Sequence, residues 1–419
     1  MKNILKKTII FLTIKAIQKY RALKKILGLR PDILLFPADL SSLSGSRGDQ
    51  AMIIATKVQL NHLFKCNAKY SSIVRGHNAI YESKSLEIQP LCIENYSLIS
   101  EIRKLLSRFD VVVFIGADVL DGYYSAETSN LIWDWADQAI NVKCISIITG
   151  FSFNDYPSVE VVKKIQTVSK KIVVNLRDPI SYNRFIKACP DRQANLTADI
   201  AFLLDASDDV EIFHPKSTAW IRHRRNCGDA LCGFNINPHL ASQLEITGLS
   251  VDALIQSSAN AITRIIKKHK ISFLLLPHDF REESHDEKVL ERLLELIDEE
   301  CKDSIHVVTS QPTAPAIKAL VSQLDFVITG RMHLAIAALG NCVPAAGITY
   351  QGKFDGLILG HFNLPDSFVI TPEYACVEEN IFALIEDSYK NYPSYKKMLA
   401  SVLPKINDLA EQNFAILAK

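Results

Sequence analysis

The chain has 419 residues, of which 48% are hydrophobic and 22% charged, and its net charge is +1. This composition is typical of a globular protein and excludes a disordered chain, a collagen-like repeat and a disulfide scaffold. The charge is uneven: residues 1–30 contain nine basic and no acidic side chains, so the remainder has 38 basic and 46 acidic ones, a net charge of −8. A basic arm joined to a mildly acidic body, with no recognition motif, argues against a nucleic-acid partner.

The arm contains an apolar stretch of seven residues, 8–14, about a third of the roughly twenty residues that a membrane-spanning helix needs. More basic residues follow it and no small-residue cleavage site is present, which disfavours a signal peptide. Two alternatives stay open: a helix at an anionic membrane surface, or a helix packed on the body with a solvated basic face. The nine cysteines lack zinc-site spacing and indicate reduced thiols. We therefore expect a cytoplasmic protein, at the inner face of the plasma membrane if residues 1–30 bind lipid.

Short apolar runs alternate with segments of helical period from residue 32 onward. In the first half, strands are predicted at 33–37, 70–74, 111–115, 144–148 and 172–176, and helices at 50–64, 96–108, 127–139 and 158–169. In the second half, strands are predicted at 231–235, 271–276, 305–309, 326–329 and 345–348, and helices at 251–268, 286–301, 314–323, 334–339 and 394–418. Uniformly apolar runs of this length are typical of strands buried in a parallel sheet.

Two βα series of similar length predict an α/β protein with two Rossmann-like domains whose parallel sheets face a cleft. The predicted parts are the arm at 1–30, an N-terminal Rossmann-like domain at 31–205, a linker at 206–230, a C-terminal Rossmann-like domain at 231–375, and C-terminal helices at 376–419 that pack across the hinge. In such sheets ligands gather at the carboxyl ends of the strands, so the residues that follow each strand are the candidates for a site.

Polar and glycine-rich loops follow the strands of the first half. GSRGDQ, residues 45–50, contains Gly48 and Asp49 and precedes a helix, so it either turns its N–H groups toward an anion or is a plain turn that Asp49 caps. The strand at 111–115 leads into Gly116 and Asp118. The strand at 172–176 leads into Arg177, which either binds a carboxylate or phosphate or pairs with Asp178 beside a Ser181 helix cap.

The second half carries the strongest cluster. The strand at 271–276 leads into His278, which either reaches the cleft or caps the sheet. The strand at 326–329 leads into Arg331 and His333 at the start of an apolar helix, which places a fixed cation and a titratable imidazole beside helix N–H groups. This pattern predicts an anion site with a proton donor. Lys353, after the next strand, either adds a second positive charge or is a solvated surface lysine.

Seven motifs occur in an order that resembles the polysaccharide pyruvyl transferase family across about residues 33–365: GSRGDQ, IGAD, LRDPIS, TADIAF, LPHDF, TGRMHLAIAAL and ITYQGKFDGL. The resemblance implies a GT-B-like fold, with the acceptor on the side of the domain at 31–205 and the donor on the side of the domain at 231–375. It also implies transfer of a pyruvyl group from phosphoenolpyruvate to a saccharide or lipid-linked saccharide as a ketal. By this likeness Arg177, Arg331 and His333 match positions that bind or protonate the donor. The chain departs from the family where a glycine run is replaced by 116–118 and where Ser46 replaces Asn, both on the side expected to hold the acceptor.

For this chemistry the donor needs several cations and one acid, which we assign to Arg177, Arg331, Lys353 and His333, with Asp49 or Asp118 accepting a hydroxyl proton. No metal or other cofactor is expected. Two alternatives stay open: a GT-B-type glycosyltransferase that uses a nucleotide sugar, and an inactive scaffold protein of polysaccharide assembly, for which the altered 116–118 loop would be the evidence.

Overall fold

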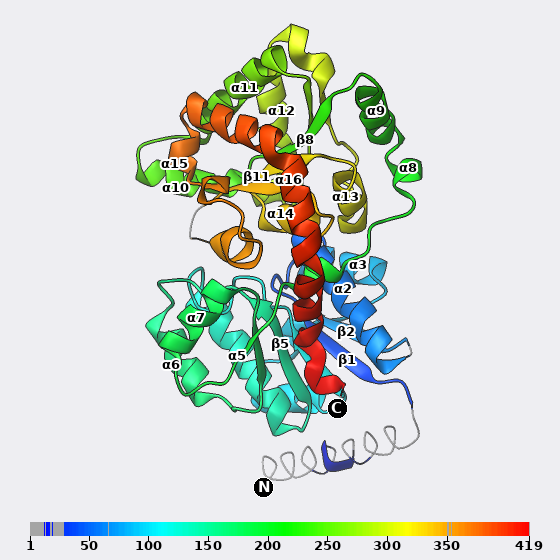
Figure 1. The fold of residues 1–419 in the computed structure, drawn as a ribbon. Helices are drawn as coiled ribbons and strands as arrows, with labels where there is room; N and C mark the ends of the chain where they lie inside the picture. Colours follow the sequence, from blue (N-terminus) through cyan, green and yellow to red (C-terminus); the bar gives the residue numbers. More distant parts are fainter. Residues whose placement is uncertain are drawn as a thin grey trace. The chain divides into compact units, whose positions relative to one another are not determined.

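A computed structural model of the chain describes residues 12, 14–16, 19, 29–65, 67–349, 352 and 354–418 (Figure 1). Its contacts divide the chain into two units. Unit 1 comprises Met1–Ser44, Met52–Leu203 and Asp408–Lys419, and unit 2 comprises Gly45–Ala51 and Leu204–Asn407. The predicted basic arm falls almost wholly outside the described residues. Of the described ones, Ile14 is partly buried against the hydrophobic core of unit 1.

Unit 1 contains a seven-stranded parallel sheet in the order β3-β2-β1-β4-β5-β6-β7, the Rossmann order with one added strand. Its strands are β1 (Asp32–Phe36), β2 (Lys69–Val74), β3 (Gln89–Cys92), β4 (Val111–Phe114), β5 (Ile145–Phe151), β6 (Val173–Leu176) and β7 (Asn195–Leu196). Its helices are α2 (Arg47–Phe64, of which the first turn belongs to unit 2), α3 (Gly76–Ser85), α4 (Ile99–Leu106), α5 (Ala126–Asn141), α6 (Val159–Thr167) and α7 (Pro179–Ala188).

Unit 2 repeats this plan with a six-stranded parallel sheet in the order β10-β9-β8-β11-β12-β13. Its strands are β8 (Ala230–Asn235), β9 (Ile271–Leu275), β10 (Ile305–Val307), β11 (Phe326–Thr329), β12 (Ala345–Ile348) and β13 (Val369–Ile370). Its helices are α8 (Val210–Phe213), α9 (Pro215–Asn226), α10 (Ala241–Ile246), α11 (Val251–Lys268), α12 (Asp286–Leu296), α13 (Ala314–Val321), α14 (Met332–Leu339), α15 (Pro372–Ala375) and α16 (Glu378–Glu411, of which the residues from Asp408 onward belong to unit 1), and a π-helix spans Asp355–His361.

The central strands form because their side chains are apolar on both faces. All four residues of β4 and of β11 are buried, as expected for strands covered by helices on each side. In unit 1, Phe36 lies with its ring centroid 5.4 Å from that of Phe114 and 5.4 Å from that of Trp135, so β1, β4 and α5 share one core. The predicted fold class, two Rossmann-like α/β units with parallel sheets, is confirmed.

Helix α11 shows how local sequence sets an element's ends. The Ser250 hydroxyl accepts a hydrogen bond from the Ala253 N–H at the helix start, and Asp252 lies in the first turn. Lys267 and Lys268 lie in the last turn, where positive charge is favourable near the exposed carbonyls. The predicted range, 251–268, agrees with the helix observed.

Several elements have no counterpart in the sequence prediction. The edge strands β3, β7 and β13 are two to four residues long and carry no apolar run. The segment predicted as a linker, 206–230, contains α8 and α9, and only Ser217, Thr218 and Ile221 of α9 are buried. Because only one of these buried residues is apolar, the sequence of α9 shows little helical periodicity of hydrophobic residues.

Candidate functional site

The segment Gly45–Ala51 lies against the loop that follows β9 in unit 2. The Phe280 N–H donates to the Gly45 carbonyl at 2.9 Å, and the Arg47 N–H donates to the His278 carbonyl at 3.0 Å. These two bonds pair the segment with residues 278–280 in antiparallel fashion. The loop predicted as an anion site is therefore fixed, by backbone contacts, beside the predicted site residue His278.

The side chain of Arg47 anchors the same segment. Its Nε donates to the Pro312 carbonyl at 2.6 Å and its Nη2 to the Gln311 carbonyl at 3.2 Å. The guanidinium carbon also lies 4.4 Å from the centroid of the Phe280 ring, a cation–π contact. The residue is only 7% exposed, so these contacts are shielded from water. The first turn of α2 is thus held by two loops of unit 2.

Gly48, in this first turn, is in direct contact with His333. A Cβ atom added to Gly48 would lie 2.4 Å from Nδ1 and 2.7 Å from Cγ of the His333 ring, so any other residue would displace that ring. His333 is itself in the first turn of α14, which begins at Met332. The two helix starts therefore meet at one imidazole. Because the N-terminus of a helix presents N–H groups and partial positive charge, this junction suits an anion.

Asp49, also predicted as a site residue, lies in the same first turn and is 9% exposed. Three predicted residues, Gly48, Asp49 and His333, thus belong to one junction of two helices. In the sequence, His333 is almost three hundred residues away from Gly48 and Asp49.

Arg331 is held by two buried carboxylates. Its Nη2 donates to Oδ1 of Asp286 at 2.6 Å and to the Ser284 carbonyl at 2.8 Å, its Nε donates to Oδ1 of Asp286 at 3.1 Å, and its Nη1 donates to Oδ2 of Asp279 at 3.1 Å. These contacts use four of the five N–H groups of a guanidinium. Arg331 therefore holds its loop in place and has little donor capacity left for an anion.

Asp286 connects the ends of three strands. Besides binding Arg331, its Oδ2 accepts from Nδ2 of Asn235 at 2.9 Å and from the His278 N–H at 2.9 Å. Asn235 is the last residue of β8, His278 follows β9 and Arg331 follows β11. The Asp286 side chain that they share is fully buried. The order of the sheet reverses at β8, so the cluster lies at the topological switch point where such folds bind ligands.

The charges in this cluster shift the pKa of its acids and bases. Burial alone would raise the pKa of Asp279, but the hydrogen bond from Arg281 and the positive charges of Arg331 and Arg281 outweigh it and lower the pKa to about 2. Burial, followed by the charges of His333 and Arg331, lowers the pKa of His278 well below its usual value. Asp279 is therefore ionised, and His278 neutral, near pH 7.

Sequence reasoning missed the loop after β8. Asn237 donates from Nδ2 to the Gly330 carbonyl at 3.2 Å, which supports the turn before Arg331. Burial and the charge of Arg331 lower the pKa of His239 in the same loop. The sequence could have indicated this loop, because Asn237 and His239 both follow the predicted strand at 231–235. The other candidate residues were chosen because they follow predicted strands in the same way. Asp286 gave no such signal, because an acidic residue at a helix start is ordinary.

Arg177 and Asp118 belong to unit 1. Arg177 is 4% exposed, donates from Nε to Oγ of Ser152 at 2.8 Å, and forms an ion pair with Asp199 at 3.1 Å. Its partner is thus Asp199. The alternative pairing with Asp178 is wrong, because the Asp178 carboxylate caps α7 by accepting from the Ser181 N–H at 2.7 Å.

Asp118 accepts a hydrogen bond from the Tyr124 hydroxyl at 3.2 Å. It follows Gly116, where an added Cβ would lie 2.2 Å from the Thr149 carbonyl oxygen, so the loop is tightly packed on β5. Lys353, the last predicted site residue, lies outside the described residues. Among the described residues, no group of three or more potential metal ligands comes together and no helix is long and apolar enough to cross a membrane.

Comparison with known proteins identifies the family. The profile of the polysaccharide pyruvyl transferase family matches residues 17–352. The chain belongs to this family. Its family consists of transferases of polysaccharide biosynthesis. The resemblance indicated by the seven sequence motifs is confirmed. No curated protein matches the chain by sequence.

Solved structures with a similar fold agree with the predicted GT-B-like architecture. A putative UDP-N-acetylglucosamine 2-epimerase from Listeria monocytogenes is 11% identical with a TM-score of 0.57, over 91% of this chain and 94% of that one. S. aureus MnaA, solved with UDP, is 10% identical with a TM-score of 0.58, over 93% and 98%. A glycosyltransferase from Rickettsia africae is 12% identical with a TM-score of 0.55, over 93% and 98%. At such identities the likeness shows the fold alone.

Proposed function

We propose that the chain transfers the pyruvyl group of phosphoenolpyruvate to a sugar of a cell-surface polysaccharide, or of its lipid-linked precursor, and releases phosphate. The observation that carries the proposal is the junction of α2 and α14 at His333. It combines two helix N-termini, which suit a phosphate or carboxylate, with an imidazole that can carry a proton. Family membership supports a saccharide acceptor.

The reaction needs one proton donor and one proton acceptor. The methylene carbon of phosphoenolpyruvate gains a proton and becomes a methyl group, which makes the neighbouring carbon electrophilic. Two sugar hydroxyls form bonds to that carbon while its bond to the phosphate oxygen breaks. Of the two hydroxyl protons, one replaces the proton delivered to the methyl group and the other leaves with the phosphate.

In this scheme His333 protonates the methylene carbon and the N–H groups of the two helix starts bind the phosphate. Asp49, in the same turn as Gly48, accepts a hydroxyl proton. Neutral His278 contributes a hydrogen bond rather than a charge. Arg331 acts mainly by holding the loop that carries His333, because its contacts to Asp279 and Asp286 use most of its donors.

The test is phosphate release from phosphoenolpyruvate in the presence of a panel of saccharide acceptors, followed by mass spectrometry of the acceptor. In D2O the ketal methyl group should carry one deuterium, which reports protonation of the methylene carbon directly. His333→Ala should abolish both signals, whereas His223→Ala, an exposed histidine on α9, should leave them unchanged. An active and folded His333→Ala protein would remove His333 from the reaction.

A second candidate function is transfer of a sugar from a nucleotide donor. It is favoured by one observation: the similar fold of S. aureus MnaA, which was solved with UDP. The two functions differ in their released product, phosphate in one case and a nucleoside diphosphate in the other. Release of nucleotide from a UDP-sugar, with no phosphate released from phosphoenolpyruvate, would replace the first function with the second.

A further inference from the structure

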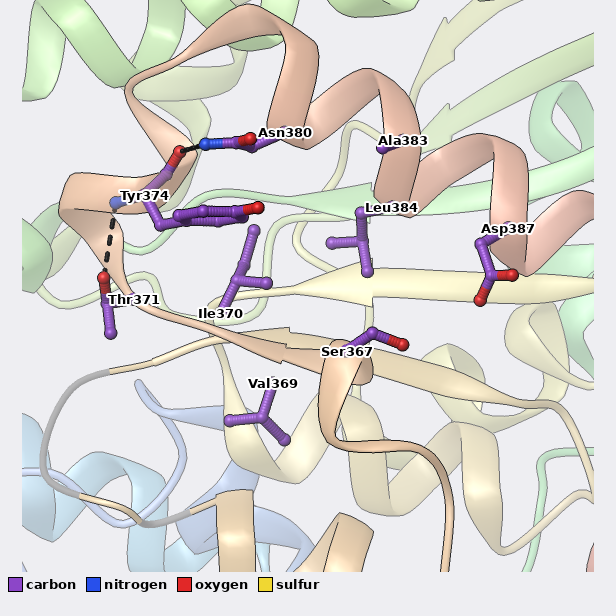
Figure 2. Close-up of a pocket in the computed structure, with 9 residues that line it drawn as sticks. All are labelled: Ser367, Val369, Ile370, Thr371, Tyr374, Asn380, Ala383, Leu384 and Asp387. Atoms are coloured by element: carbon purple, nitrogen blue, oxygen red, sulfur yellow. Dashed lines mark hydrogen bonds between the residues drawn. The ribbon is translucent and has the colours of Figure 1, made fainter.

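A cavity of about 580 Å³ lies in unit 2 between the edge strand β13 and the first turns of α16 (Figure 2). This volume is within the range of small-molecule sites, roughly 300 to 1,000 Å³. Nine of the described residues line it: Ser367, Val369, Ile370, Thr371, Tyr374, Asn380, Ala383, Leu384 and Asp387. None of them belongs to the junction at His333, so this is a separate site.

The cavity has an apolar floor and a polar rim. Ile370 of β13 is 8% exposed and Leu384 of α16 is 5% exposed, so both form a packed floor. The residues from α16 recur at intervals of three and four, which places them on one face of the helix. Figure 2 shows the Tyr374 hydroxyl directed toward Leu384, with the Asp387 carboxylate and the Ser367 hydroxyl at the other end.

Tyr374 is 55% exposed although its ring is large and mostly apolar. Its backbone is held from two sides by other residues of the cavity. The Tyr374 N–H donates to Oγ1 of Thr371 at 3.3 Å, and the Tyr374 carbonyl accepts from Nδ2 of Asn380 at 2.8 Å (Figure 2). An exposed aromatic side chain on a fixed backbone offers a large contact area to a ligand. Little conformational entropy is lost when the ligand binds, which favours binding.

The lining selects the chemistry of a ligand. Among the described residues that line it there is no lysine, arginine or histidine, and the one carboxylate among them, Asp387, repels anions. Oδ1 of Asp387 accepts from Nδ2 of Asn391 at 2.8 Å, and no described residue donates a hydrogen bond to Oδ2. Hydroxyl, amide and carboxylate groups around an apolar floor and an aromatic ring complement a molecule that has an apolar face and several hydroxyl groups.

A peptide fits this cavity less well. Added strands bind through main-chain hydrogen bonds along a sheet edge, but β13 has only two residues. A phosphate, a nucleotide or an acidic sugar would meet the Asp387 carboxylate, and no described residue of the lining offers a basic side chain to offset it.

We propose that this cavity is a second saccharide site, which binds a neutral sugar segment of the acceptor away from the residues that carry out transfer. The assignment rests on the proposed function, because it takes the acceptor to be a saccharide chain. The aromatic ring of Tyr374 packs on the apolar face of a sugar ring, and Asp387 and Ser367 bind its hydroxyl groups. The consequence is that long acceptors bind more tightly than short ones.

Binding is tested on the full chain with neutral glucose and galactose trisaccharides, measured by calorimetry and by saturation-transfer NMR. We expect Tyr374→Ala to weaken binding at least tenfold and Asp387→Asn several-fold. Val377→Ala is the matched control, since Val377 is 54% exposed nearby but does not line the cavity, and it should bind as the wild type does. Absence of binding by every neutral trisaccharide, or equal binding by wild type and Tyr374→Ala, would overturn the proposal. So would Tyr374-dependent binding of peptides or uronic-acid trisaccharides in preference to neutral ones.

Two further results separate this proposal from the proposed function. Tyr374→Ala should raise KM for long acceptors about tenfold relative to KM for short ones, and an unchanged ratio counts against the second site. His333→Ala should abolish transfer to long and short acceptors and still bind the trisaccharides. Trisaccharide binding that depends on Tyr374, without transfer to any acceptor, would sustain the second site and reject the transfer function.

Discussion

Replacing Gly48 with alanine tests whether the junction at His333 is the reaction site. The added Cβ would lie 2.4 Å from Nδ1 of His333, whereas ordinary contacts begin at 3.4 Å, so the imidazole must move by about 1 Å. A displacement of this size costs roughly a hundredfold in rate, or about 2.7 kcal/mol of transition-state stabilisation. The effect on folding is small, because overpacking costs about 1 to 3 kcal/mol and alanine regains about 1 kcal/mol of helix preference over glycine.

The assay is kcat/KM for phosphate release beside the free energy of unfolding from urea titration. Gly233→Ala is the matched control: its Cβ would lie 2.8 Å from Cδ1 of Leu324, a similar clash within β8 and away from His333. We expect Gly48→Ala to lose activity with little loss of stability, and Gly233→Ala to lose stability with little loss of activity. If kcat/KM of Gly48→Ala stays within threefold of wild type, the position of the His333 ring does not matter to the reaction and the assignment is wrong.

Three further predictions concern stability and membrane binding. The pKa of Asp279 is about 2 in the folded chain, well below the usual value of an aspartate, so its ionised form adds about 2 kcal/mol of stability above pH 4. This stability is lost as the pH falls toward 2. Urea titration at pH 6 and pH 3 should show the loss, and Asp279→Asn should show a smaller difference between the two pH values. Asp286→Asn should lower the free energy of unfolding by about 3 to 5 kcal/mol, because it leaves the buried charge of Arg331 short of a partner; a loss below 1 kcal/mol would show that Asp279 and Ser284 suffice. Deleting residues 1–30 should weaken binding to anionic liposomes at low salt and leave binding to neutral liposomes unchanged. Thermal melts of the shortened chain test separately whether the contact of Ile14 with the core supports folding.

Much of the fold could be predicted because its central strands carry the signal themselves. The strands at 326–329 and 345–348 were predicted with the bounds observed, since a run of buried apolar residues both forms the strand and marks it. The edge strands could not be found this way. Gln89–Cys92 contains a proline and has no fully buried residue, so its strand conformation depends on pairing with β2 rather than on its own composition.

The site was predicted in part, for a related reason. His333, Gly48 and His278 follow strands or open helices, and the topology of a parallel sheet gathers such positions at one edge. What the sequence could not supply is the partner of each charge. Asp286 is almost fifty residues before Arg331 in the chain, and nothing in its local sequence distinguishes it from a helix-capping acid, yet it accepts hydrogen bonds from the ends of three strands.

These partners change what the arginines can do. In sequence, Arg177 and Arg331 look alike, since each follows a strand and each could bind an anion through its guanidinium. In the structure each is paired with a buried carboxylate, Asp199 in one case and Asp286 in the other. A guanidinium whose N–H groups are already accepted by carboxylates would have to give up those bonds to hold phosphate, at a cost of about 1.5 to 3 kcal/mol for each. For this reason the proposed reaction assigns anion binding to the helix starts at the junction of α2 and α14, and gives the arginines the task of positioning the loops that form it.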